Sequence, residues 1–413
     1  MHGDKSFSGH ILISMKEFAN WSGSIRFTPK NYHLLDGEEE ISRLVAEAYS
    51  KNERVKIIGA GHSSQPLFVT DSTLINIGHL SGLTKVDKKN NTACFLGGTT
   101  IADAGRQLAK YGYQLHNIGD IDHQHLVGAF ATGTHGSGKS LPNLPSMMTG
   151  CRIIDGTGNI KSFNDYMNPE IMRAMRLHLG VLGIMTGVTI KMKPMRDYIR
   201  REFCTTYEAL LKHREDLITN NEMFDFYWYP QDDKIKIRTC NPVESDCGEL
   251  PFAEEQKDRL RVGLLYKTLP KERTMKFDEM EYAIPYEAGP DCFDVIRKRV
   301  LDKHSDYVWW RILYRIVMQD DAYLSPFNDG NCVTIAILRK AGRPFEDYFK
   351  DIEPILRDFG GKPHWGKKSF IAAKDLKRLY PKWDEFSSMR TMLDPGNVFL
   401  NDYLSGLFGT VKK

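Results

Sequence analysis

The segment Val55–Ser64 (VKIIGAGHSS) constrains the fold most, because it places a glycine-rich turn directly after an apolar, strand-like run. Gly59 and Gly61 allow the backbone to turn tightly and to point successive amides at an anion. His62 and Ser63 then face whatever the turn binds. A second glycine-rich loop, Ala131–Lys139 (ATGTHGSGK), lies further along the chain. Two amide-rich loops in one domain favour a ligand with two neighbouring phosphates, such as a dinucleotide.

Two commoner glycine motifs are excluded by the residues that come after each loop. The dinucleotide fingerprint requires a third glycine where this chain has Ser64. It also opens a helix, whereas the next apolar run, Thr73–Ile77, is strand-like. The segment Gly133–Ser140 matches the P-loop pattern of nucleotide-triphosphate-binding proteins, but Pro142 and Pro145 deny it the helix that this motif must open. The P-loop match is therefore interpreted as accidental.

Length and composition describe an ordinary globular protein with more than one domain. A chain of 413 residues is too long for one typical core, and 41% of its residues are hydrophobic and 26% charged. The net charge of +3 gives no argument for nucleic acid or a membrane surface as a partner. No apolar run approaches the roughly eighteen residues of a spanning helix. The seven cysteines form no CxxC pair and residues 1–5 contain no apolar signal core, so a cytoplasmic location is expected.

Hydrophobic periodicity places helices and strands along the chain. Helices are predicted at Glu38–Ser50, Thr99–Gly112, Asp291–Asp302 and Phe345–Phe359. Strands are predicted at Val55–Ile58, Thr73–Ile77, Phe224–Tyr229, Lys234–Thr239 and Cys332–Leu338, with a further pair inside Gly150–Phe163 that turns at Asp155-Gly156. The charged stretch Met195–Glu202, which follows Pro194, is interpreted as a domain boundary.

Seven short segments follow one another in a recognisable order along the chain: Asn20-Trp21, Gly59–Ser63, Ala131–Gly138, His178–Gly183, Asp320–Pro326, Pro363–Lys367 and Leu393–Pro395. Together they resemble the vanillyl-alcohol-oxidase/PCMH-type flavoproteins, and within them the aldonolactone and alditol oxidases. The resemblance implies an α+β fold with a two-part PCMH-type FAD-binding domain over residues 17–194. It also implies a cap domain with a large antiparallel sheet over residues 195–372, and a C-terminal segment, 373–413, that returns to the FAD domain.

The resemblance further implies where FAD binds. In that family the histidine that matches His62 bonds covalently to the 8α-methyl group of the flavin, which requires a neutral imidazole on a flexible turn. The alternative is that His62 only caps the phosphate-binding loop. The other implied FAD contacts are Ile58, Gly59, Ala60, Gly61, Ser63, Gly119, His125, Gly128, Ala131, Thr132, Gly133, His135 and Ile184.

Three residues are implied to act in catalysis. Arg315 and Lys367 match cations that face the flavin and the substrate, where fixed positive charge stabilises the negative charge of reduced flavin. Asp120 and Lys367 are both candidates for handling the hydroxyl proton of the substrate. Gly119 matches a position where a small residue leaves oxygen a path to the flavin. The segment Gly119–His125 (GDIDHQH) also suggests metal ligands, but no third cluster with ligand spacing supports this reading, and no metal is expected.

The implied substrate site departs from the family pattern. Relatives commonly carry Glu-x-Arg, in which the glutamate contacts substrate hydroxyl groups, whereas this chain has Leu313-Tyr-Arg315. Alditol-type relatives carry a histidine on the facing strand, at the position of Leu338. The resemblance implies His364 as a third substrate contact. Because unpaired hydroxyl groups lose affinity, a lactone or a less polar alcohol is expected to react better than a free polyol.

The expected activity is that of an FAD-dependent oxidase. A hydride would move from a carbinol C–H of a sugar-derived alcohol or aldonolactone to the flavin, and oxygen would be reduced to hydrogen peroxide. The expected partners are this small-molecule substrate and oxygen, and the oligomeric state is left open. Two alternatives remain: a dehydrogenase on the same scaffold with a quinone or cytochrome acceptor, and a tailoring flavoprotein that acts on a less polar alcohol.

Overall fold

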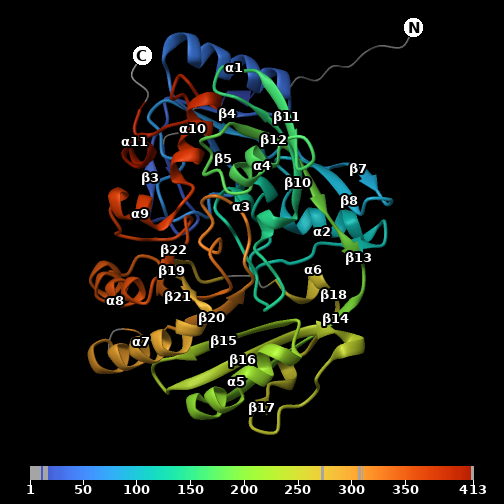
Figure 1. The fold of residues 1–413 in the computed structure, drawn as a ribbon, viewed down its shortest axis with the longest axis vertical. Helices are drawn as coiled ribbons and strands as arrows, with labels where there is room; N and C mark the ends of the chain where they lie inside the picture. The colour runs from blue at the N-terminus through green and yellow to red at the C-terminus, as the bar shows by residue number, and fades with distance from the viewer. Residues whose placement is uncertain (1–10, 13–16, 271–273, 306–307, 309, 411–413) are drawn as a thin grey trace.

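The protein is described by a computed structural model that covers residues 11–12, 17–270, 274–305, 308 and 310–410. Two sheets and the C-terminal helices lie at one end of the molecule, and a large third sheet lies at the other (Figure 1). Residues 1–5, on which the expected location partly rests, lie outside the described residues. Among the described residues, no helix is both long and apolar enough to cross a membrane.

The first sheet carries the first glycine loop. Its strand order is β1 (Ile11–Leu12), β4 (Asn31–Leu34), β6 (Thr73–Asn76) and β5 (Val55–Ile58). Helix α1 (Glu38–Lys51) connects β4 to β5, which both pair in parallel with β6. Three acidic residues occupy the first turn of α1, where the helix dipole favours negative charge. The helix buries Ile41, Val45 and Ala48. The predicted helix and the two predicted strands, Val55–Ile58 and Thr73–Ile77, are confirmed by α1, β5 and β6.

The second sheet is antiparallel, and its apolar residues pack in the same hydrophobic core as those of the first sheet. Its order is β11 (Ile160–Asn164), β10 (Met148–Ile154), β12 (Ile184–Lys191), β8 (Thr92–Leu96) and β7 (Leu83–Asp87). The turn between β10 and β11 lies where Asp155-Gly156 predicted it. The Asp155 carboxylate accepts hydrogen bonds from the amides of Thr157 at 2.9 Å and Asn159 at 3.0 Å. This side chain therefore closes the turn by bonding to its own backbone.

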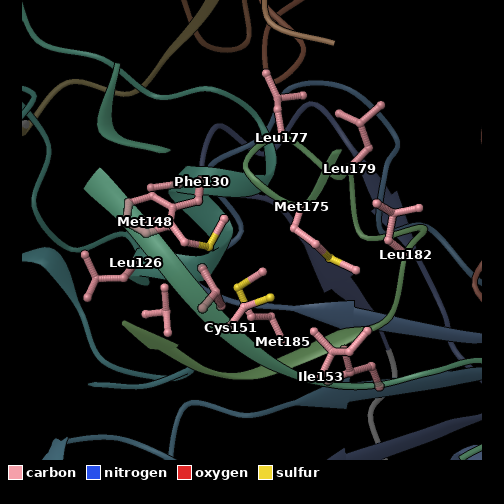
Figure 2. Close-up of a cluster of buried hydrophobic side chains, with 14 of the residues drawn as sticks. Leu126, Phe130, Met148, Cys151, Ile153, Met175, Leu177, Leu179, Leu182 and Met185 are labelled. Carbon is pink, nitrogen blue, oxygen red and sulfur yellow. The ribbon is translucent and has the colours of Figure 1, made fainter. Parts of the chain in front are cut away.

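Two helices border this core. Helix α2 (Ile101–Ala109) is shorter than predicted, because Thr100 caps it and the chain turns away before Gly112, whose φ is +81°. Helix α3 (Leu126–Ala131) follows. Figure 2 shows the apolar side chains that pack between α3, β10 and the segment 175–185. The labelled residues are Leu126, Phe130, Met148, Cys151, Ile153, Met175, Leu177, Leu179, Leu182 and Met185.

The third sheet is a large antiparallel sheet, as the resemblance implied. Its order is β17 (Glu254–Glu255), β14 (Asp197–Thr206), β16 (Lys234–Pro242), β15 (Met223–Tyr229), β20 (Ile312–Val317), β21 (Cys332–Lys340), β19 (Phe277–Pro285) and β22 (Lys362–Pro363), with β18 (Arg261–Leu264) also paired to β14. Helices α5 (Tyr207–Asn220), α7 (Gly289–Lys303) and α8 (Glu346–Asp358) cover one face and enclose a second core. The opposite face is turned toward the first two sheets (Figure 1).

The charged stretch that was interpreted as a domain boundary leads into the first strand of the third sheet. Residues 197–202 belong to β14, which pairs along its length with β16. Its charges are tolerated there because they are paired: Arg200 contacts Glu202 with both side chains buried, and Arg201 bonds to Asp246 at 2.8 Å.

The C-terminal segment packs back against the first sheet. Helices α9 (Ala373–Leu379), α10 (Trp383–Leu393) and α11 (Asp402–Phe408) contribute to the first core. The amide of Val55 donates to the carbonyl of Val398 at 2.8 Å, and the Lys56 ammonium donates to the carbonyl of Phe399 at 2.8 Å. The chain end therefore stabilises the strand that leads into the first glycine loop.

The second glycine loop does not open a helix, which confirms the rejection of the P-loop. A short 3₁₀ turn, Leu144–Met147, follows it and contains Pro145. Gly138 instead meets the third sheet, where its amide donates to the carbonyl of Ile316 at 2.8 Å. A Cβ at this position would lie 2.4 Å from the carbonyl oxygen of Glu222, so the close approach requires glycine.

The other helices and strands are short: β2 (Phe18–Ala19), β3 (Arg26–Phe27), β9 (Tyr113–Gln114), β13 (Lys193–Pro194), α4 (Pro169–Met175) and α6 (Leu265–Thr268).

Candidate active site

Two cavities meet at the first glycine loop. The first, called the loop cavity, runs along residues 56–63, α3 and the segment 178–185. The second, called the sheet cavity, lies between the glycine loops and the open face of the third sheet. His62, Ser63, Gln124 and Thr132 line both cavities. A ligand that fills the two spaces must therefore pass His62.

The loop cavity contains most of the predicted cofactor contacts. These are Ile58, Gly59, Ala60, Gly61, His62, Ser63, His125, Gly128, Ala131 and Thr132. The predicted contacts Gly119 and His135 line the sheet cavity instead. Gly133 and Ile184 line neither cavity and lie next to residues that do.

The walls of the loop cavity suit an elongated ligand with phosphate groups. Gly61 has a φ of +66°, which turns the chain between the two cavities. Strand β5 ends and α3 begins at the cavity wall, so backbone amides and a helix N-terminus are available to an anion. The Nε2 of His178 is buried without a hydrogen-bond partner among the described residues, and this histidine also lines the cavity. A buried polar atom of this kind fits a polar ligand group.

His62 is held at the junction in a neutral state. Its ring stacks on Trp21 with 5.2 Å between centroids. The neighbouring chain is fixed, because the Trp21 amide donates to the carbonyl of Gly61 at 2.8 Å and the Asn20 side chain donates to that of Ser63 at 3.0 Å. Burial lowers the pKa of His62 to about 4, and the charge of Lys367 adds to this effect. At neutral pH the imidazole therefore keeps a free electron pair for bonding.

The sheet cavity is lined by both apolar and polar side chains. The apolar or aromatic side chains come from both halves of the molecule: Trp21, Ile121, Phe277, Leu313 and Leu338. Charged and hydroxyl groups lie among them: Asp120, Tyr227, Glu279, Glu281, Arg311, Arg315 and Lys367. The predicted catalytic residues and the predicted substrate contacts Leu313, Leu338 and His364 thus all line one space.

Asp120 and Arg315 belong to a buried network. The Asp120 carboxylate accepts from Tyr227 Oη at 2.9 Å, from Arg238 Nη1 at 3.0 Å and from Arg315 Nη2 at 3.5 Å. Arg238 also bonds to both oxygens of Asp225. Burial opposes the charge of Arg315, but Asp120 and Glu281 hold its pKa above the usual value. Arg315 is therefore a permanent cation at the cavity wall.

Lys367 is fixed on a short turn that joins both halves of the site. The amide of Lys367 donates to the carbonyl of His364 at 3.0 Å, and the amide of Ser64 donates to that of Gly366 at 2.8 Å. The indole of Trp365 donates to the carbonyl of Leu324 at 2.7 Å. The Lys367 ammonium contacts Glu279 of β19. The turn therefore holds a cation beside the loop that carries His62.

A buried cluster of two histidines and a carboxylate lines the same cavity. One ring nitrogen of His135, one of His364 and one carboxylate oxygen of Glu281 lie within 4.8 Å of one another. Such a set can hold a metal ion. However, Nδ1 of His364 accepts the amide of Gly366 at 3.0 Å, so the ring proton is on Nε2 and neither nitrogen has a free electron pair. This hydrogen bond disfavours His364 as a metal ligand.

Sequence reasoning missed the carboxylates of β19. Phe277, Glu279 and Glu281 alternate along this strand and line the cavity, whereas Met280 and Tyr282 lie on the other face of the strand, in the core under the helices. Acidic residues in an otherwise apolar strand were the available signal, because a buried carboxylate requires a partner. Tyr227 and Arg311 were missed too, and their signal was weaker because both residues are common on exposed strands.

Comparisons with known proteins identify the family of the chain. Residues 29–164 match a family described as FAD binding domain, and residues 248–407 match D-arabinono-1,4-lactone oxidase. L-gulono-1,4-lactone dehydrogenase of Mycobacterium tuberculosis is 30% identical over 434 aligned positions, which cover 95% of this chain and 99% of the relative. L-gulonolactone oxidase of Mus musculus is 26% identical over 95% of this chain and 98% of its own.

A solved structure of a cholesterol oxidase from B. sterolicum shares the fold, with a TM-score of 0.85 over 97% of both chains at 16% identity. The glycine-loop cavity, the large antiparallel sheet and the full-length relatives together establish the protein class. The chain belongs to the aldonolactone oxidase family and is an FAD-dependent oxidoreductase with a PCMH-type fold.

Proposed function

We propose that the protein oxidises an aldonolactone, or a closely related sugar-derived alcohol, with FAD bonded to His62. The observation that carries this proposal is the meeting of the two cavities at a neutral, stacked imidazole, with Lys367 and Arg315 in the wall of the sheet cavity. The loop cavity would hold the FAD. When bound, FAD supplies the acceptor for the hydride of a carbinol C–H.

The walls of the sheet cavity support a lactone as substrate. A sugar lactone is a compact ring with hydroxyl groups on its edge and C–H groups on its faces. The aromatic side chains of Trp21 and Phe277 can pack on such a face, and their ring centroids lie 5.1 Å apart. The carboxylates of Glu279 and Glu281, which line the same cavity, can accept hydrogen bonds from the hydroxyl groups of the lactone. The relatives named as dehydrogenase and as oxidase are both named after L-gulonolactone, which supports a lactone as the substrate.

The residues of the chain have separate tasks in this proposal. Arg315 and Lys367 place fixed positive charge where negative charge develops, which lowers the barrier without any rearrangement. The stacked Trp21 and the fixed turn at Gly61 orient His62. The apolar side chains of Leu313 and Leu338 exclude water and leave less room for extra hydroxyl groups.

We infer oxygen as the electron acceptor, because Gly119 leaves space at the cavity wall. A Cβ at Gly119 would lie 3.2 Å from the carbonyl oxygen of His135, a residue that also lines this cavity. The alternative acceptor is a quinone or a cytochrome, and the name of the mycobacterial relative, a dehydrogenase, favours that alternative.

The test is to mix the purified yellow protein with L-gulono-1,4-lactone and other lactones without oxygen, and to follow the flavin absorbance. Loss of the oxidised spectrum supports the proposed reaction, and no change with any lactone or sugar alcohol contradicts it. Admission of air or of cytochrome c to the reduced enzyme then separates oxidase from dehydrogenase by peroxide yield. Acid precipitation tests the bond to His62: the colour should stay in the pellet and should move to the supernatant in His62→Ala.

A further inference from the structure

Glu281 occupies a central position on the face of the third sheet that lines the cavity. In an antiparallel sheet, directly opposed residues on neighbouring strands share a face. Tyr227 opposes Leu313, Leu313 opposes Ala336, and Ala336 opposes Glu281. Glu281 therefore lies in the same row as Leu313, about 10 Å away across two strand spacings. Because Ala336 between them is small, the Glu281 carboxylate faces the cavity without obstruction from its own sheet.

The second glycine loop brings an imidazole to this carboxylate. The Nε2 of His135 lies 3.1 Å from Oε1 of Glu281, and both side chains are at most 2% exposed. The Nδ1 of His135 lies 2.9 Å from the carbonyl oxygen of Gly136, which can only accept, so Nδ1 carries a proton. The free electron pair of a neutral His135 is then on Nε2, beside an oxygen that also accepts.

Nε2 of His135 and Oε1 of Glu281 can accept one proton between them. Neither Nε2 of His135 nor Oε1 of Glu281 has a well-aligned hydrogen-bond partner among the described residues. Two electron pairs that face each other at this distance in a dry site repel, and a proton between them removes the repulsion. Burial opposes ionisation of Glu281, but a protonated His135, together with His364 and Lys367, holds the pKa of this carboxyl well below its usual range. A proton taken up by the pair therefore comes to rest on the imidazole, and the carboxylate stays ionised beside it.

The other carboxylates at the cavity are already engaged. Asp120 accepts hydrogen bonds from Tyr227, Arg238 and Arg315. Glu279 contacts the Lys367 ammonium. A carboxylate held by a guanidinium or an ammonium is a weak base, because protonation would break its ion pair. The charges of Arg315 and Lys367 also act on Glu281, but the group in direct contact with it is an imidazole, which can share a proton.

We propose that Glu281 and His135 act as one general base that takes the hydroxyl proton of the substrate. This inference rests on the proposed oxidation of a carbinol. The substrate O–H bond breaks and its proton passes to Glu281, where it is shared with Nε2 of His135. The electron pair of the O–H bond forms the C=O bond as the carbinol hydride leaves to FAD. The net charge of the Glu281–His135 pair rises by one in this step, next to the flavin site, which gains negative charge.

The test compares Glu281→Gln, which keeps the size of the side chain, with Glu353→Gln. Glu353 is a buried carboxylate of α8 that accepts the Phe370 amide at 2.7 Å on the far side of the sheet. Flavin reduction by L-gulono-1,4-lactone is followed without oxygen from about pH 5 to 9, and loss of a general base should slow it about 100-fold or more. The wild-type rate should rise with pH as the pair loses its proton, and this rise should disappear in Glu281→Gln. Lactone binding should change far less than the rate.

A second readout does not depend on turnover. The ¹⁵N shifts of His135 in the flavin-loaded protein report which nitrogen carries a proton at each pH. In Glu281→Gln these shifts should change, because a neutral amide shares no proton with the ring, whereas Glu353→Gln should leave them unchanged. His135→Asn should show the same loss of the pH-dependent rise in rate.

Wild-type rate and pH profile in folded, flavin-loaded Glu281→Gln would overturn the proposal. An unchanged titration of His135 would also overturn it, because the two groups would then share no proton. If no lactone or alcohol reduces the wild-type flavin, the proposed function fails instead. In that case the histidine titration still decides whether the proton-sharing pair exists.

Discussion

Replacement of Arg315 by methionine should slow flavin reduction strongly while leaving the fold intact. The guanidinium lies at the cavity wall, 3.5 Å from Asp120. Asp120 keeps its bonds to Tyr227 at 2.9 Å and to Arg238 at 3.0 Å, so no buried carboxylate is left without a partner. The loss of one preorganised charge-stabilising group should lower the reduction rate by about 100- to 1,000-fold, or roughly 2.7–4 kcal/mol. Arg315→Lys should recover part of this rate because the charge remains.

Arg238→Met is the matched control, since it removes a guanidinium from the same network behind the cavity. Arg238 bonds to both Asp120 and Asp225 and is 5% exposed. Its loss leaves two buried carboxylates poorly paired, which typically costs about 3–5 kcal/mol of the free energy of unfolding. Arg238→Met should therefore unfold at lower urea concentration, whereas Arg315→Met should unfold near the wild-type midpoint.

Stopped-flow absorbance without oxygen measures the reduction rate, and urea titration measures the stability of the same samples. If Arg315→Met binds FAD and reduces it at a rate within roughly tenfold of wild type, Arg315 does not provide the proposed charge stabilisation. If it loses as much stability as Arg238→Met, its main contribution is to the fold, and the assignment to catalysis would be wrong.

Three further predictions concern specificity, the acceptor and pH. Leu313→Glu should raise kcat/KM for sorbitol by about tenfold or more, because a charge-assisted hydrogen bond contributes roughly 1.5–3 kcal/mol, with Leu313→Gln as the neutral control. Efficient sorbitol oxidation by the wild type would contradict this reasoning. Gly119→Ala should slow reoxidation by oxygen several-fold and leave anaerobic reduction nearly unchanged, since the new Cβ lies 3.2 Å from the His135 carbonyl oxygen; equal reoxidation rates would refute the oxygen path. Burial lowers the pKa of His178 to about 4 and of His364 to about 3. Unfolding therefore takes up protons as the pH falls from about 6.5 to 4, and these two histidines together should lower the free energy of unfolding by up to about 2.7 kcal/mol per pH unit. Urea titrations at pH 7 and pH 5 measure this, and a His178→Gln variant should show a smaller loss.

Local sequence was sufficient for features that depend on backbone conformation. Gly61 lies at positive φ in a tight turn after β5, as its place in the first loop predicted. Pro145 lies in a 3₁₀ turn, as expected for a segment that cannot begin an α-helix. Each constraint acts within a few residues of the chain. The order of the seven motifs was enough to identify the family and its α+β fold before any contact was known, because such motifs are read directly from the sequence.

The identity of the groups at the catalytic cavity depended on the tertiary structure. Leu313 predicted a site without the family carboxylate, but the register of β19 against β21 brings Glu279 and Glu281 to the same face. Asp120, a predicted proton acceptor, was found within bonding distance of Arg238 and Arg315, which are far from it in sequence.

The sequence by itself therefore determined the fold, the cofactor class and the position of the first glycine loop. Which side chains face the substrate cavity, and which carboxylate there is free to accept a proton, was decided only when the third sheet packed against that loop. The physical reason is that the basicity of a buried carboxylate is set by neighbours within a few ångströms. Glu281 and its neighbour His135 come from distant parts of the chain and meet only in the folded protein.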